Sequence, residues 1–188
     1  MTTPEQRARI FITIFFLAAA AGFAVYRKYS VADRLVSLDD VLRDEAGADL
    51  RALNETQRAK LVPQLVGSLK SREPRTRLLA VRALGKLGPA AGAAIPELLP
   101  MMADTGLESA VGAETVIAYA RIAPDPMPLL LAVLKDGDME ARRNVACGLA
   151  GLGPVAAPAA PLLTELANAE DPDLRRCARL ALEKIPRK

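Results

Sequence analysis

Apolar residues recur along residues 61–185 with the spacing of amphipathic helices. In residues 77–88, Arg-Leu-Leu-Ala-Val-Arg-Ala-Leu-Gly-Lys-Leu-Gly, small and apolar side chains fall at i, i+3, i+4 and i+7. This spacing puts them on one face of an α-helix. Here the face consists of Ala80, Ala83, Leu84 and Leu87. It recurs twice more along the chain, as Val145, Gly148, Leu149 and Leu152, and then as Ala178, Ala181, Leu182 and Ile185. The pattern predicts an all-α domain.

Prolines and glycines divide this pattern into helix pairs. The prolines that open the first helix of each pair are 33, 32 and 33 residues apart: Pro63, Pro96, Pro128 and Pro161. Proline suits a first helical turn, where its missing N–H would have had no partner. Gly88 and Gly153, each followed by proline, mark the ends of second helices. Because one such pair cannot bury its own apolar face, the repeat predicts pairs that stack on one another.

In residues 61–185 the chain resembles the HEAT-repeat family. The segments that carry the resemblance are 77–88 and 138–153, the latter Asp-Met-Glu-Ala-Arg-Arg-Asn-Val-Ala-Cys-Gly-Leu-Ala-Gly-Leu-Gly. The resemblance implies an α-solenoid of about four HEAT-like helix pairs over residues 54–188. It implies no particular activity, since the family consists mostly of binding scaffolds with unrelated partners.

The second repeat unit departs from the others. It has Gly112 where the other units have arginine, and it has the additional Pro100 inside its first helix. Two interpretations stay open for this unit: drift within a degenerate repeat, or a bend or docking point in the solenoid.

Residues 10–26 carry no charge and follow a polar tail, residues 1–9. Seventeen helical residues reach about 25 Å, slightly less than a typical hydrocarbon core, and flanking arginines and tyrosines can make up the difference. We therefore predict a single transmembrane helix, followed by a juxtamembrane helix and linker over 27–53. A cleaved signal peptide is the alternative. The side chains expected to hold the anchor in lipid are Ile10, Phe11, Ile14, Phe15, Phe16, Leu17, Phe23 and Tyr26.

The side of the membrane is nearly undetermined, because the basic residues on the two flanks of this span almost balance. An N-terminal signal-anchor usually leaves its C-terminal domain outside, which favours the periplasmic side of an inner membrane. The two cysteines favour the cytoplasm instead, since we interpret Cys147 and Cys177 as unpaired packing residues. Their separation of 30 residues does not match the repeat step.

Two helices are predicted within residues 31–68. Val31, Leu35, Leu38 and Leu42 form an apolar line that predicts a helix ending near Gly47. This helix either packs on the first pair or binds another subunit. Asn54 followed by Gln57 predicts a capped helix that runs through Ser68.

Arginines are the most regular polar feature of the repeat. Arg77, Arg142 and Arg175 stand at equivalent positions, each four residues after an acidic residue. We interpret them as a structural ladder that binds acids and turn carbonyls in adjacent units. The alternative is an anion-binding stripe that also includes Arg143, Arg176 and Arg179.

Little in the sequence points to catalysis. The chain has no histidine, the commonest general base and metal ligand, and it lacks the common nucleophile and phosphate-loop motifs. Acidic pairs such as Asp39 and Asp40, or Asp136 and Asp138, lie in predicted turns. We therefore predict no catalytic residue, no metal and no cofactor. With 25 basic against 22 acidic residues, the charge also argues against nucleic acid.

These observations favour a non-enzymatic, membrane-anchored scaffold or accessory subunit of a larger membrane complex. Its predicted partners are the lipid bilayer and protein subunits, with no small-molecule substrate. The alternatives are a HEAT-like nucleic-acid-binding or base-processing protein and a small HEAT-like pigment lyase, for which Cys147 is the candidate reactive group. The predicted contacts to partner subunits are Ile12, Phe16 and Ala19 on one face of the anchor, with Met101 and Ile117 in the second unit.

Overall fold

The computed structural model describes residues 29–104 and 110–186. Within these two ranges every regular element is a helix and none is a strand, which confirms the predicted all-α class. The predicted polar tail, the transmembrane helix and its anchor residues lie outside the described residues.

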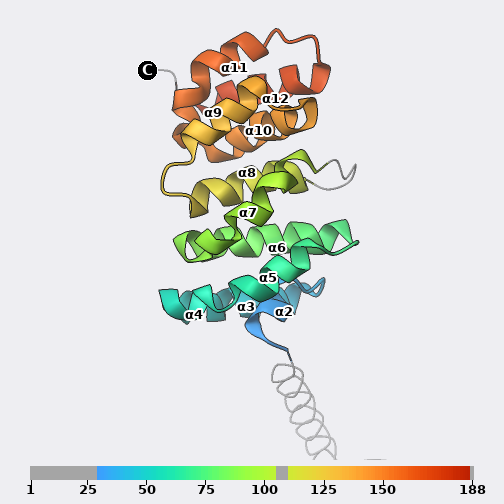
Figure 1. Ribbon diagram of the computed structural model, residues 1–188, viewed down its shortest axis with the longest axis vertical. Coiled ribbons are helices and arrows are strands. Elements are labelled where there is room, and N and C mark those ends of the chain that lie inside the picture. The colour runs from blue at the N-terminus through green and yellow to red at the C-terminus, as the bar shows by residue number, and fades with distance from the viewer. Residues whose placement is uncertain (1–28, 105–109, 187–188) are drawn as a thin grey trace, which may run out of the picture.

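The described helices follow one another with short connections, and most come in pairs that stack in layers (Figure 1). Over the described part of the chain, the pairs are α5 with α6, α7 with α8, α9 with α10 and α11 with α12. The second helices α6, α8, α10 and α12 each contact the next one along. The bounds are α2 Val31–Leu35, α3 Asp40–Ala52, α4 Glu55–Ala59, α5 Val62–Leu69, α6 Pro74–Leu87, η1 Gly88–Ala94, α7 Ile95–Leu98, η2 Leu99–Ala103, α8 Val111–Ile122, α9 Met127–Asp136, α10 Met139–Leu152, η3 Gly153–Ala159, α11 Ala160–Leu166 and α12 Pro172–Lys184.

The predicted apolar face of the second helices forms the core between layers. Leu84 of α6 and Leu149 of α10 have no exposed surface, and Ala178 of α12 is equally buried. Burying one such leucine contributes about 2 kcal/mol. Leu152 and Leu182 differ from their equivalents, because they are only half-buried.

Gly88 and Gly153 end α6 and α10 as the sequence predicted. Their φ angles are +63° and +56°, and they are the only positive values in the described ranges. A residue with a Cβ rarely adopts this conformation, so glycine is needed at both bends. The following prolines lie in the first turns of the 3-10 helices η1 and η3.

The predicted single helix from Val31 to Gly47 is wrong. Helix α2 ends at Leu35, and Asp39 begins α3 by accepting hydrogen bonds from the backbone N–H groups of Val41 and Leu42. Gly47 lies inside α3 and does not end it. Leu38, which the predicted apolar line included, is 56% exposed in the turn between the two helices.

Helices α2 and α3 share the hydrophobic core of the first pair. Ala32, Leu35, Ala46 and Leu50 are buried in the same cluster as residues of α5 and α6. Arg34, which is 3% exposed, binds Asp49 at 2.7 Å and ties α2 to α3. Of the two interpretations of this segment, the contacts therefore support packing on the first pair.

The predicted capping box at the start of α4 is confirmed. The Asn54 side chain accepts from the Gln57 backbone, and the Gln57 side chain accepts from the Asn54 backbone. The helix ends at Ala59, however, and α5 begins separately at Val62, so the predicted continuous helix through Ser68 is two helices.

Two helical stretches of the described residues are long and apolar enough to cross a membrane: Pro74–Ala103 and Met139–Leu166. Each bends at a glycine with positive φ, and each contributes leucines to the core between layers. Core helices of a packed domain meet the same criteria, so these stretches do not replace the span predicted over residues 10–26.

Candidate functional site

The three equivalent arginines each bind a backbone carbonyl in the last turn of the first helix of their own pair or in the turn that follows it. This agrees with a structural role, although the predicted bonds to adjacent units are found only for Arg77, which also binds Asp104 at 3.1 Å. Each guanidinium thus holds the connection between the two helices of a pair. The bonds run from Arg77 Nη1 to Ser71 O at 3.1 Å, from Arg142 Nε to Leu134 O at 3.0 Å and from Arg175 Nη1 to Ala169 O at 2.6 Å.

The second pair has Gly112 at this position, and the structure shows why. Asn144 of α10 reaches into the space, and its Nδ2 donates to Met102 O at 2.9 Å and to Asp104 O at 3.3 Å. A Cβ at Gly112 would overlap the Asn144 amide. Asn144 of the third pair therefore binds the backbone carbonyls of the second pair, whereas in each of the other pairs an arginine of the same pair does so.

Ion pairs that the sequence analysis did not predict connect neighbouring layers. Arg82 of α6 binds Glu114 of α8 at 3.3 Å. Arg143 of α10 binds both carboxylate oxygens of Asp171, and its Nε lies 2.9 Å from Oδ1. Asp171 also caps α12 by accepting from Leu174 N. The hydrogen bond from Arg143, followed by that from Leu174, lowers the pKa of Asp171 to about 2.

Cys147 and Cys177 form a disulfide, so the prediction that they are unpaired packing residues is wrong. Their Cα atoms are 4.7 Å apart, within the usual range for a disulfide. The bond joins α10 to α12. The two cysteines occupy the positions that are equivalent to Arg82 and Glu114, which link α6 to α8. Cys147 and Arg82 each lie five residues after the equivalent arginine of their helix, and Cys177 and Glu114 each lie two residues after Arg175 or Gly112. Cys147 therefore offers no free thiol for the lyase reaction.

The alternative anion-binding stripe is not assembled as predicted. Arg143 is bound to Asp171 and Glu140, and Arg179 Nε donates to Ala167 O at 3.0 Å. Arg176 differs, because its side chain is 68% exposed and its ion pair, with Asp173, is exposed as well.

The predicted contact residues of the second unit are not exposed. Met101 is half-buried against the core of the first pair, and the Ile117 Cδ1 lies close over Gly151 of α10. Ile12, Phe16 and Ala19 lie outside the described residues.

Three of the four acidic residues that the sequence placed in turns have local structural roles. Asp39 and Asp138 cap α3 and α10, and Asp40 pairs with Arg43. Among the described residues, no group of three or more His, Cys, Asp or Glu is placed to hold a metal ion.

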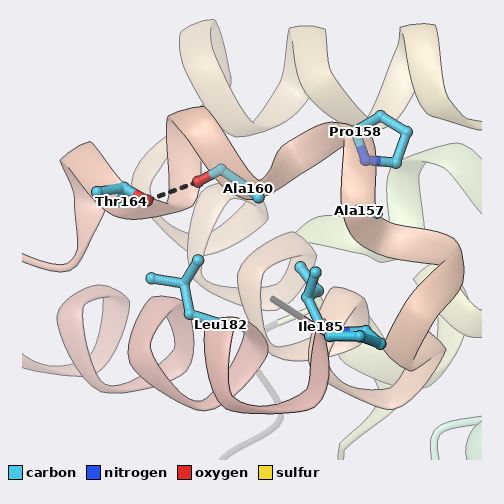
Figure 2. Close-up of a pocket in the computed structure, with 7 residues that line it drawn as sticks. Ala157, Pro158, Ala160, Thr164, Leu182 and Ile185 are labelled. Atoms are coloured by element: carbon cyan, nitrogen blue, oxygen red, sulfur yellow. Dashed lines mark hydrogen bonds between the residues drawn. The ribbon is translucent and has the colours of Figure 1, made fainter. Parts of the chain in front are cut away.

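An apolar hollow of about 750 Å³ opens at the α12 end of the stack. Figure 2 shows Leu182 of α12 and Ile185, the residue after this helix, directed toward α11, which carries Ala160 and Thr164. The Thr164 hydroxyl is satisfied within its own helix, since it donates to Ala160 O at 2.8 Å. The hollow therefore offers shape and apolar surface, and it holds no reactive group. Its lining is completed by Ala157, Pro158 and Pro186.

The chain matches no protein-family model, no curated protein and no solved structure in these comparisons.

Proposed function

We propose that this protein is a non-enzymatic, membrane-anchored scaffold or accessory subunit, and that its stacked pairs form an α-solenoid of HEAT-like type. The observation that carries the proposal is the stacking itself. Each second helix buries one face against the next, and the described polar side chains are used mainly in caps, turns and links between layers. A stack of this kind offers an extended surface for protein contacts.

The disulfide supports a location of the stack outside the cytoplasm. Disulfides persist in oxidising compartments such as the bacterial periplasm and are rare in the cytosol. Cys177 is 1% exposed, so its bond to Cys147 is shielded from reducing agents on one side. With residues 10–26 as the span, the proposal places the repeat domain on the periplasmic side of the inner membrane.

Co-purification of the full-length chain in mild detergent tests the proposal. We expect membrane proteins to be recovered with it in fixed ratio, identified by mass spectrometry. A variant that lacks residues 1–28 should stay folded by circular dichroism and lose most of these proteins, because two linked contacts bind more tightly than either alone. Recovery of no membrane protein with the full chain would contradict the proposed function.

A further inference from the structure

The α12 end of the stack differs from every layer below it, because no further helix pair of the described chain covers it (Figure 1). Leu182 occupies the position at which Leu84 and Leu149 are completely buried, yet it is only half-buried beside the apolar hollow. Two further hollows adjoin the first, share Leu182 and Arg179 with their neighbours, and extend along α12 to Arg176.

The lower layers show what fills such a groove. The groove of the first pair is covered by η1, which contacts both α5 and α6 and buries Ala91 and Ala94 completely. The groove of the third pair is covered in the same way by η3, through Ala156 and Ala159. A helical segment with small apolar side chains is therefore the occupant that this groove accepts elsewhere in the molecule.

Arg176, at the edge of these hollows, indicates a second property of the segment that would bind there. Arg176 stands at the position of Arg143, which binds the carboxylate of Asp171 at the start of the next second helix. Both arginines also pair with an acid three residues earlier, Glu140 or Asp173. The one difference is that no carboxylate of a following layer reaches Arg176 in the described chain.

Two charged residues argue against another pair stacking here as α12 stacks on α10. Arg179 takes the position of Val81 and Ala146, neither of which has any exposed surface. Glu183 takes the position of Gly85, whose Cα lies so near Ala118 that an added Cβ would be 3.1 Å from it. Close stacking would bury both charges, at a high cost in free energy.

We propose that this end surface, formed by the hollows along α11 and α12, binds a helical segment of a partner protein that carries small apolar residues and an acidic first turn. Its small side chains enter the groove at Leu182 and Ile185, and its carboxylate binds Arg176. The inference rests on the proposed scaffold function and assigns the docking site for it.

Photo-crosslinking in native membranes tests this assignment with the full-length chain. A photoreactive residue replaces Leu180, which lines the end surface and is 39% exposed, or Leu99 of the second unit, which is 36% exposed and serves as the matched control. We expect an adduct from position 180 whose crosslinked peptide, mapped by mass spectrometry, contains Asp or Glu beside small apolar residues. An adduct of two copies of this chain, an adduct from position 99 alone, or no adduct from position 180 would overturn the inference.

A charge reversal separates this inference from the proposed function. Arg176→Glu should lower the adduct yield at position 180 about tenfold, because a carboxylate contact becomes a repulsion. Arg75→Glu changes an exposed arginine of α6 and should leave the yield unchanged. Both variants should keep the parent melting temperature. Undiminished adduct and co-purification with Arg176→Glu would sink the docking site and leave the scaffold function standing, whereas absence of co-purifying membrane proteins would sink both.

Discussion

The second and third helix pairs hold their internal turns by different means. In the third pair, Arg142 of α10 binds the carbonyl of Leu134 in the last turn of α9, within the same pair. In the second pair, Gly112 replaces the arginine, and Asn144 from the third pair binds the turn carbonyls of Met102 and Asp104. Arg77 of the first pair reaches Asp104 from the other side. The second pair therefore depends on both of its neighbours, whereas the third is self-sufficient at this turn.

This difference changes how the irregular repeat is understood. Gly112 and Asn144 are complementary, since the side chain of one fills the space that the other leaves. Unconstrained drift would not require such a match. The bonds also give a physical reason for Gly112 that does not depend on partner binding.

The largest expected effect comes from placing a charge in the core of the third pair. Leu149→Asp should unfold the domain, because burial of an unpaired carboxylate costs roughly 4 kcal/mol or more, a large fraction of a domain's stability. Thermal unfolding by circular dichroism measures it. Leu152→Asp, at a half-buried position of the same helix, should be much milder, and equal melting temperatures for the two variants would show that the layer core is misassigned.

Removal of the disulfide should affect the last two pairs next. Cys147→Ser with Cys177→Ser should lower the free energy of unfolding by ~3.5 kcal/mol, as expected for a loop closed between residues 30 apart. Urea denaturation under oxidising conditions measures the loss, and parent protein in reductant serves as the control. If the oxidised parent and the double variant had the same unfolding midpoint, the bond would not be formed in solution.

Much of the fold was predictable because it follows from local rules. The apolar spacing, the capping box at Asn54 and the helix ends at Gly88 and Gly153 each depend on residues close together in sequence. The missed features join layers: Cys147 to Cys177, Arg143 to Asp171 and Asn144 to Met102. They link different positions of neighbouring units, so comparison of equivalent positions could not find them. For the two links Cys147–Cys177 and Arg143–Asp171, separations of 30 and 28 residues, slightly less than one repeat, were the available signal, whereas Asn144 and Met102 are 42 residues apart.

Smaller effects should distinguish the two ways of holding a turn. Arg142→Ala and Asn144→Ala should each cost about 1–2 kcal/mol, since each removes hydrogen bonds to half-buried carbonyls. Amide hydrogen exchange should then differ by location. Arg142→Ala should speed exchange at Gly137, and Asn144→Ala at Asp104, whose amides close these turns. Faster amide exchange at Gly137 in both variants would contradict the assignment of Arg142 to the turn of the third pair and of Asn144 to the turn of the second.

The smallest expected effect is on the stability of the domain at acidic pH. The depressed pKa of Asp171 means that its contribution to stability is fully present above about pH 4 and is lost as the pH falls toward about 2. Asp171→Asn should therefore reduce the dependence of the melting temperature on pH in this window. Asp173→Asn changes an exposed pair and serves as the control. An unchanged pH dependence in Asp171→Asn would rule out the bond to Arg143 as its cause.

A double-mutant cycle between Gly112 and Asn144 tests the dependence of the second pair on its neighbour most directly. Gly112→Arg alone should destabilise the domain by about 2 kcal/mol, because the new side chain overlaps the Asn144 amide. Asn144→Gly alone leaves the turn carbonyls without their donor. Together the changes should restore the arrangement of the other pairs, with an arginine bound within its own pair. The loss of unfolding free energy in the double variant should therefore be smaller than the sum of the two single losses by at least ~1 kcal/mol. Simple additivity of the two losses in urea denaturation would contradict this account.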